Sequence, residues 1–247
     1  EFNMFEGMLT NVIGTKNIAD AASKANVSTF VQISTDKAVN PSNIMGASKR
    51  IAESYCQALD LAKGPNMTRF ITVRFGNVLG SAGSVVALFR NQISEGGPVT
   101  VTDPKMKRYF MTVREAVELV LGASALGTTQ PKQVGKIFVL EMGKPVLIQN
   151  LAEQMIRLAG HTPNKDIKII YTGQRPGEKL FEEIFHDGEK LVETSQSGVM
   201  LAAPRVVDLK DITLQIDKIN EAININDGEY LIKIIRDLVP EYSPPSK

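Results

Sequence analysis

Three consecutive residues, Thr35, Asp36 and Lys37, carry side chains suited to proton transfer and follow a short apolar run. A carboxylic acid and an amine side by side can serve as acid and base on neighbouring atoms of one substrate. Met45 and Lys49 follow four residues apart, a spacing that places them on one face of a helix. Each residue alone also suits a structural role, as a helix cap, core filler or solvated lysine. The combined spacing favours an acid–base site.

The surrounding segments alternate between helix and strand patterns. Apolar residues recur at helical spacing over 5–25, and a short β-rich run covers 29–33. A second helix is predicted over 42–63, where a Gly-Pro pair ends it, and a second strand over 68–78. Strands that alternate with helices predict an α/β fold with a doubly wound parallel sheet.

The second half of the chain predicts a smaller α/β region that binds substrate. Its expected elements are a helix at 84–94, a strand at 99–102, a helix at 113–126, a strand at 136–140, a helix at 148–159 and a strand at 166–171. We expect residues 1–95 to belong to a nucleotide-binding domain. Residues 96–247 should mainly bind substrate, with some elements returning to the first domain and a loose tail at the end.

The glycine-rich turn that holds a dinucleotide pyrophosphate is not found in this sequence. No Gly-x-Gly-x-x-Gly lies between a predicted strand and helix, and the nearest glycine cluster, at 80–84, follows the wrong strand. We therefore expect a partial Rossmann-like sheet whose N-terminal half is absent from this sequence.

Several motifs occur in the order typical of one family. They are Asn-Val-Ile-Gly-Thr at 11–15, Ser-Thr-Asp-Lys at 34–37, Met-x-x-x-Lys at 45–49, Arg-Phe-Gly-Asn-Val-Leu-Gly-Ser at 74–81, Val-Thr-Val-Thr-Asp-Pro at 99–104 and Arg-Pro-Gly-Glu-Lys-Leu at 175–180. Together they resemble the extended short-chain dehydrogenase/reductase superfamily. The nearest resemblance is to its long, membrane-attached nucleotide-sugar 4,6-dehydratases of bacterial polysaccharide biosynthesis (capsule, O-antigen and glycan). These carry methionine where most members have the catalytic tyrosine.

The resemblance implies a lyase that uses NAD to convert UDP-N-acetylglucosamine into a UDP-4-keto-6-deoxy sugar. Lys37 would be the base at C5, and Asp36 the acid that protonates the C6 hydroxyl as it leaves. Thr35 would lie near the C4 oxygen, and Lys49 would hold the nicotinamide ribose. Met45 occupies the tyrosine position, and a thioether cannot take a proton. The C4 proton would go to Asp36 or to a water bound to Lys49, and the sequence leaves both routes open.

The resemblance also assigns residues that bind cofactor and substrate. Those expected at the cofactor are Phe75, Gly76 and Val78, and those expected at the UDP-sugar are Asn77, Ser84, Arg108, Arg175 and Glu178. Arginine suits a diphosphate because it can donate two parallel hydrogen bonds. The alternative for the charged residues is a set of ordinary ion pairs. Lys107 departs from the family pattern, which has threonine there.

Two other functions fit the same scaffold: a UDP-sugar epimerase, and a non-catalytic fragment that binds sugar nucleotides. The Asp36–Lys37 pair argues against simple epimerisation at C4, which needs neither a base at C5 nor an acid at C6. His161 and His186 have no partners at metal-ligand spacing, so no metal site is expected.

Composition bounds the remaining possibilities. The 247 residues are 43% hydrophobic and 22% charged, with a net charge of +1, which gives no case for nucleic-acid binding. Cys56 is the one cysteine, which excludes an internal disulfide framework and suits a reducing compartment. No apolar run reaches the roughly 18 residues that span a bilayer. We expect a cytoplasmic protein, or the cytoplasmic domain of a bacterial inner-membrane protein.

A homodimer is expected from the two first helices, 5–25 and 42–63, because members of the superfamily commonly pair through such helices. The supporting residues are apolar positions beyond one face of each helix, namely Met8, Val12, Ile18, Ile51, Tyr55 and Leu59. A two-fold interface would bury them. The alternative is that the first half of the sheet, absent from this sequence, covers these faces.

Overall fold

The computed structural model describes residues 3–62, 67–81, 83–130, 133–185 and 191–244. The chain forms two compact units. The first comprises Glu1–Phe75, Glu118–Glu141 and Glu183–Lys247, and the second comprises Gly76–Val117 and Met142–Glu182. The sequence predicted a domain boundary at residue 95, and this boundary stays a prediction. Both units of the structure are made of separate stretches of chain.

The first unit contains a five-stranded sheet. Its strands lie in the order β1 (Thr29–Thr35), β2 (Arg69–Phe75), β7 (Ile137–Leu140), β11 (Val199–Ala202) and β10 (Val192–Glu193). The first three strands are parallel, and β11 and β10 continue the sheet antiparallel. This parallel-rich α/β architecture confirms the predicted fold class.

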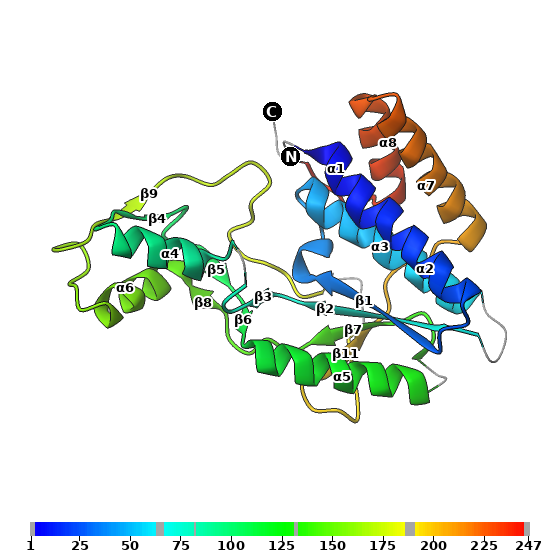
Figure 1. Ribbon diagram of the computed structural model, residues 1–247, viewed down its shortest axis with the longest axis horizontal. Coiled ribbons are helices and arrows are strands. Elements are labelled where there is room, and N and C mark those ends of the chain that lie inside the picture. The colour runs from blue at the N-terminus through cyan, green and yellow to red at the C-terminus, as the bar shows by residue number, and fades with distance from the viewer. Residues whose placement is uncertain (1–2, 63–66, 82, 131–132, 186–190, 245–247) are drawn as a thin grey trace. The chain divides into compact units, whose positions relative to one another are not determined.

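Helices cover both faces of this sheet (Figure 1). The N-terminal helix runs through α1 (Met4–Met8), a π-helical turn at Leu9–Ile13 and α2 (Gly14–Lys24). Helix α3 (Ile44–Leu61) packs with it on one face. On the other face lies α5 (Val113–Thr129), whose Gly127 allows close approach, since a Cβ there would lie 2.6 Å from the side chain of Ile71.

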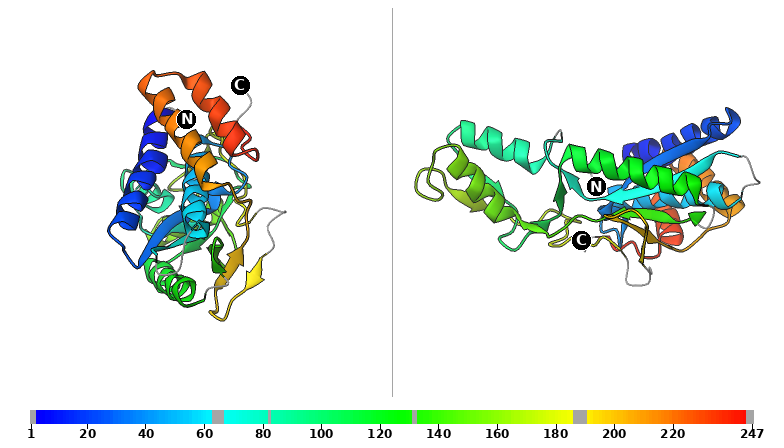
Figure 2. Two further views of the ribbon diagram at one scale, coloured as in Figure 1. Left: turned by 90° about the vertical axis from the view of Figure 1, so that its right-hand side faces the viewer. Right: turned by 90° about the horizontal axis from the view of Figure 1, so that it is seen from below.

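Two C-terminal helices, α7 (Leu209–Asn224) and α8 (Gly228–Leu238), had no counterpart in the sequence-based elements. Helix α7 packs on α3 and the π-helical turn, and α8 packs against α7, so that the two form a second layer of helices (Figure 2). Their buried side chains share one core with the N-terminal helices, including Ile212, Ile216, Ile219, Leu231, Ile234 and Ile235. The chain itself therefore covers this helical face.

Burial of these helices within the chain corrects the argument for a dimer, which relied on their apolar residues being left exposed. Met8, Val12, Ile51 and Tyr55 are at most 3% exposed, and all four belong to the core shared with α7 and α8. Ile18 is 62% exposed, and it alone among the six supporting residues is a strongly exposed apolar side chain. The alternative weighed above assigned this cover to the absent first half of the sheet, whereas the structure buries those four residues in a core shared with α7 and α8.

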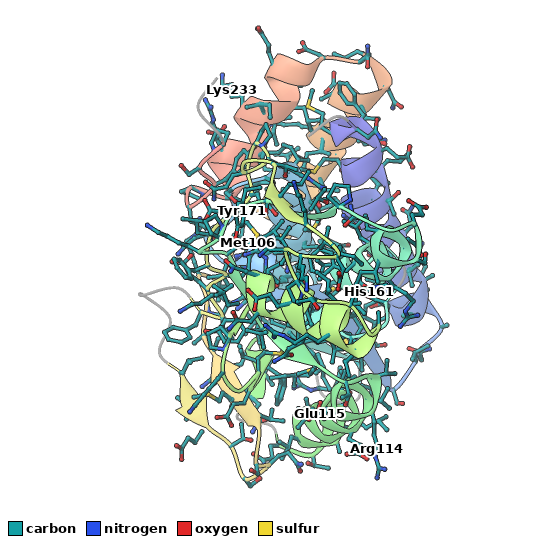
Figure 3. All side chains as sticks on the ribbon, turned by 90° about the vertical axis from the view of Figure 1, so that its left-hand side faces the viewer. Met106, Arg114, Glu115, His161, Tyr171 and Lys233 are labelled. Carbon is teal, nitrogen blue, oxygen red and sulfur yellow. The ribbon has the colours of Figure 1, made fainter. Side chains whose placement is uncertain are left out.

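The second unit is built from short strands and two helices. The strand pairs are β3 (Asn77–Val78) with β6 (Phe110–Met111), β4 (Val99–Val101) with β9 (Ile169–Tyr171), and β5 (Lys107–Arg108) with β8 (Val146–Leu147). Helices α4 (Val85–Ser94) and α6 (Ile148–Leu158) pack around a core that includes Phe89, Val99, Met106, Ile156 and Ile167. Met106 and Tyr171 mark this unit in Figure 3.

Helix α5 begins with a reciprocal cap. The backbone amide and the hydroxyl of Thr112 each donate to Glu115 Oε2 at 2.7 Å, and the amide of Glu115 donates to Thr112 Oγ1 at 3.2 Å. These hydrogen bonds lower the pKa of Glu115, which is labelled in Figure 3. Such a capping box fixes where the helix begins.

The observed bounds differ from the predicted ones in two informative places. Helix α3 begins at Ile44, because Asn43 is extended and its side chain accepts a hydrogen bond from the amide of Gly46. The predicted strand at 68–78 is divided, since β2 ends at Phe75 and the next two-residue strand belongs to the second unit. The Gly-Pro pair expected to end α3 and the last residues of the tail lie outside the described residues.

A buried charge network ties α3 to β2. Glu53 accepts hydrogen bonds from Arg74 Nε and Nη2 at 2.7 Å each, and Arg50 Nη1 lies 3.4 Å from the same carboxylate. All three residues are at most 4% exposed. Burial alone would raise the pKa of Glu53, but the two guanidinium groups outweigh burial and hold that pKa below its usual value.

Glu53→Gln should destabilise the first unit by about 3–5 kcal/mol, because it leaves buried guanidinium groups without their carboxylate. Glu153→Gln, which removes a surface pair with Arg157, should cost less than about 1 kcal/mol. Chemical denaturation measures both. The folded pKa of Glu53 is lowered, so its stabilisation is complete above the pKa of unfolded glutamate and disappears as pH falls through the folded value. Equal losses in the two variants would contradict this.

Candidate active site

The end of β1 brings the predicted acid and base into contact. Asp36–Ala38 forms one turn of 3-10 helix directly after the strand, and Thr35 Oγ1 accepts a hydrogen bond from the amide of Lys37 at 3.4 Å. Lys37 Nζ lies 2.7 Å from Asp36 Oδ1, and the hydroxyl of Thr35 donates to the same oxygen at 2.9 Å. The tight turn therefore points all three polar groups at one another.

The two oxygens of Asp36 differ. Oδ1 receives two hydrogen bonds, whereas Oδ2 is buried and has no hydrogen-bond partner within the described part of the chain. A buried carboxylate oxygen without a donor is costly unless it carries a proton or meets a ligand. Asp36 is 1% exposed and the side chain of Lys37 is 22% exposed. The arrangement can present one acidic oxygen and one amine to a small molecule.

Met45 and Lys49 lie one turn apart on α3. Met45 is 41% exposed, so it does not fill a core within the described residues, and Lys49 is partly buried. The hydroxyl of Ser48 donates to the carbonyl of Met45 at 2.7 Å and accepts from Asn11 of the N-terminal helix at 2.9 Å. These bonds fix the first turns of α3, from which both side chains extend.

Gly46 sets the spacing between α3 and the acid–base pair, and sequence reasoning missed it. A Cβ at this position would lie 2.1 Å from the carbonyl oxygen of Lys37 and 3.0 Å from the Cβ of Pro41. The helix can therefore approach the backbone of Lys37 only if residue 46 has no side chain. A glycine in the first turn of a helix, after an asparagine cap, was the available signal.

Gly46→Ala should lower the free energy of unfolding by about 1–3 kcal/mol, because backbone atoms must move to admit the methyl group. Gly7→Ala is the matched control. It also lies in a helix, but a Cβ there meets nothing within 4 Å. We expect it to raise stability by about 0.5–1 kcal/mol through helix propensity. Denaturant midpoints measure both, and stabilisation by Gly46→Ala would contradict the close contact.

Three of the predicted UDP-sugar residues meet in the second unit. Arg108 Nη2 lies 3.6 Å from Glu178 Oε1, and Glu178 Oε2 accepts a hydrogen bond from the amide of Arg175 at 3.1 Å. Arg108 Nε also lies 3.7 Å from Glu182, and the ammonium of Lys107 lies 5.6 Å from the ring centroid of Phe181. The cluster holds Arg108 largely buried, with an 11% exposed side chain, while Arg175 is exposed.

The remaining predicted residues follow the end of β2. Phe75 is its last residue, and the amide of Gly76 donates to the sulfur of Met142 at 3.4 Å. Asn77 donates from its side chain to the carbonyl of Tyr109 at 3.0 Å, and Val78 is partly buried. Ser84 caps α4, where its hydroxyl accepts from the amide of Ala87 at 3.4 Å. The described contacts give Ser84 the structural role of a helix cap.

The residues that the structure describes contain no group of three or more His, Cys, Asp and Glu that could hold a metal ion. His161, which follows α6, is labelled in Figure 3, and His186 lies outside the described residues. None of the described helices is long and apolar enough to cross a membrane.

The sequence profile of a family described as polysaccharide biosynthesis protein matches residues 1–204. The chain belongs to this family. The capsular polysaccharide biosynthesis protein CapD of Staphylococcus aureus is 56% identical over 189 residues, which is 76% of this chain and 30% of that protein. A UDP-glucose 4-epimerase of Rickettsia canadensis is 39% identical over 237 residues, 96% of this chain and 64% of that protein.

Solved structures share the fold of this chain. Pen from Bacillus thuringiensis shares 37% identity and a TM-score of 0.73, covering 83% of this chain and 60% of that one. A dTDP-glucose 4,6-dehydratase from Bacillus anthracis, in complex with NAD, has a TM-score of 0.58 at 17% identity and shows the fold alone. It covers 92% of this chain and 71% of that one. The proteins similar to this member of the polysaccharide biosynthesis family thus include a nucleotide-sugar epimerase and a nucleotide-sugar dehydratase.

Proposed function

We propose that the protein takes part in the NAD-dependent 4,6-dehydration of UDP-N-acetylglucosamine in bacterial polysaccharide biosynthesis. The observation that carries the proposal is the contact between Lys37 Nζ and Asp36 Oδ1, beside a buried Asp36 Oδ2 without a partner among the described residues. Elimination of water across C5 and C6 of the sugar needs a base that acts at C5 and an acid that acts at the C6 hydroxyl. Two adjacent side chains, one amine and one carboxylic acid, can supply both. Because the chain spans 30% of the CapD relative, the activity is proposed for the whole protein.

The residues fit the cofactor in part. Lys49 is partly buried one turn after Met45, where its ammonium can donate to a ribose hydroxyl, while the sequence carries no glycine-rich pyrophosphate loop. When bound, NAD would supply oxidation at C4 and reduction at C6. The C4 ketone acidifies the C5 proton, which Lys37 removes and later returns. Asp36 protonates the C6 hydroxyl, which leaves as water.

Asp36 must regain the proton that it gives to the leaving hydroxyl. The C4 hydroxyl loses a proton in the same reaction, so transfer of that proton to Asp36 closes the balance. The hydroxyl of Thr35 already donates to Asp36 Oδ1 at 2.9 Å, which favours this route over a water at Lys49. The exposed thioether of Met45 has no part in the transfer, since it neither gives nor takes protons.

Lys37→Ala and Asp36→Asn should each abolish dehydration and leave UDP binding largely intact, because both act at C5 and C6. The assay uses a polypeptide as long as the CapD relative that includes this chain, supplied with NAD and UDP-N-acetylglucosamine. Mass spectrometry then measures the loss of one water from the sugar nucleotide. In heavy water the wild type should incorporate deuterium at C5. Lys24→Ala, at an exposed position of α2, is the matched control with full activity expected. Normal turnover by Lys37→Ala would remove the assigned base.

The second candidate is epimerisation at C4, favoured by the name of the Rickettsia relative, a UDP-glucose 4-epimerase. An epimerase would convert substrate to an isomer of equal mass and would not need Lys37 as a base at C5. The same mass measurement therefore separates the two candidates, and unchanged mass with altered chromatographic mobility would favour the epimerase. Binding without conversion would favour a non-catalytic role.

We further propose that Arg108, Arg175 and Glu178 grip the uridine diphosphate, with Asn77 and Ser84 nearer the sugar and Phe75, Gly76 and Val78 on the cofactor side. Glu178 pairs with Arg108 and accepts from the backbone of Arg175, which places two guanidinium-bearing residues around one carboxylate. Clustered arginines suit a diphosphate.

A cytoplasmic location is proposed for this chemistry, because Cys56 is free and buried, as suits a reducing compartment.

Arg108→Ala and Arg175→Ala should each weaken UDP binding by about 1.5–3 kcal/mol, the usual contribution of a hydrogen bond to a charged group. Part of the loss should appear in turnover, because binding energy at the nucleotide also positions the sugar. Calorimetry with UDP measures the effect. Arg157→Ala, an exposed arginine of the same unit, should bind UDP as the wild type does. Unchanged affinity in both site variants would contradict the assignment.

A further inference from the structure

A cavity of about 500 Å³ lies in the first unit, directly behind the segment that carries the acid and base. Its wall includes Ala38 and Val39, which follow Asp36 and Lys37 along the chain. The other lining residues are Asn40, Arg50, Arg74, Ala203, Pro204, Arg205, Pro240 and Glu241. None of the acid–base side chains lines this cavity, so it is separate from the site described above.

The lining carries a surplus of positive charge. It contains three arginines and one carboxylate. Arg74 gives two hydrogen bonds to the buried carboxylate of Glu53, and Arg50 Nη1 lies 3.4 Å from the same carboxylate, which offsets part of the positive charge. The three guanidinium groups of Arg50, Arg74 and Arg205 thus exceed the two carboxylates of Glu53 and Glu241 by one positive charge, and Arg50 also pairs with Glu241. Arg50 is 4% exposed, so its interaction with an anion in the cavity is screened little by salt.

Glu241 shows how an oxyanion is bound there. Arg50 Nε donates to Glu241 Oε1 at 3.2 Å, while the side chain of Glu241 remains 22% exposed. Glu241 lies in the segment after α8, which is red in Figure 1. Arg205 Nη2 donates to the carbonyl of Leu238 at 2.6 Å, and the amide of Ser243 donates to the carbonyl of Pro41. The segment is anchored on both sides of Glu241, so its side chain can turn outward while the backbone stays in place.

We propose that this cavity binds a small oxyanion, held by Arg50 and Arg205 in place of the Glu241 carboxylate. Phosphate and carboxylate oxygens both match the planar donors of a guanidinium group. The apolar walls formed by Ala38, Val39, Ala203, Pro204 and Pro240 offer few competing polar groups. The occupant would touch the back of the segment that follows Asp36 and Lys37. The site thus suits an anionic effector of the neighbouring acid–base pair, and its existence does not depend on the proposed reaction.

The test is calorimetric titration of the 247-residue chain with inorganic phosphate, with malonate as a carboxylate probe, and with chloride at matched ionic strength. Saturable binding at one site per chain is expected for phosphate or malonate and not for chloride. Glu241→Gln should tighten binding about tenfold, since it removes a competing negative charge, and Arg205→Gln should weaken it about tenfold. Glu221→Gln and Arg157→Gln, which change charge at exposed positions outside the cavity, should bind as the wild type does.

Two results would overturn the proposal. One is phosphate and malonate affinity that is the same in wild type, Glu241→Gln and Arg205→Gln, which would place any binding elsewhere on the surface. The other is equal heat from chloride at matched ionic strength, which would reduce the effect to charge screening. Circular dichroism of each variant confirms that the comparison is made between folded proteins, and Arg205 is exposed, so its substitution spares the core.

Discussion

The buried carboxylate of Glu53 is the interaction on which the first unit depends. It binds Arg74 of β2 through two hydrogen bonds and lies within ion-pair distance of Arg50 of its own helix. Arg50 in turn contacts the carbonyl of Arg205 and the carboxylate of Glu241, which lie on either side of α7 and α8 in the chain. One chain of charges therefore joins the central sheet, the helix that carries Met45 and Lys49, and the C-terminal segment.

The network holds in place the helix that follows the turn carrying Asp36 and Lys37. Lys37 and Asp36 follow an edge of the parallel sheet, where β1 pairs with β2 through seven residues, and α3 meets their backbone at Gly46. A strand held in register and a helix held by buried charges leave the short turn between them little freedom. In the proposed dehydration such preorganisation would favour proton transfer at adjacent carbons, because small displacements cost much rate.

Local chemistry made part of this structure predictable from the sequence. The β-rich run before Thr35 and the helical spacing of Met45 and Lys49 placed Asp36, Lys37, Met45 and Lys49 on the right elements. Two-residue strands such as β5 and β8 carry no periodicity, so they could not be predicted. The apolar spacing of Ile212, Ile216 and Ile219 did signal a helix that was missed. Which face that helix covers depends on tertiary packing, and no local pattern encodes it.

The family match ends at residue 204, but the fold of the first unit does not end there. Helices α7 and α8 begin after that point and cover side chains from the π-helical turn and α3, among them Val12, Ile51 and Tyr55. A boundary drawn from sequence similarity would thus cut through a single hydrophobic core. Because α7 and α8 share this core with the N-terminal helices, a substitution on one side of the core limits which substitutions the other side tolerates during evolution.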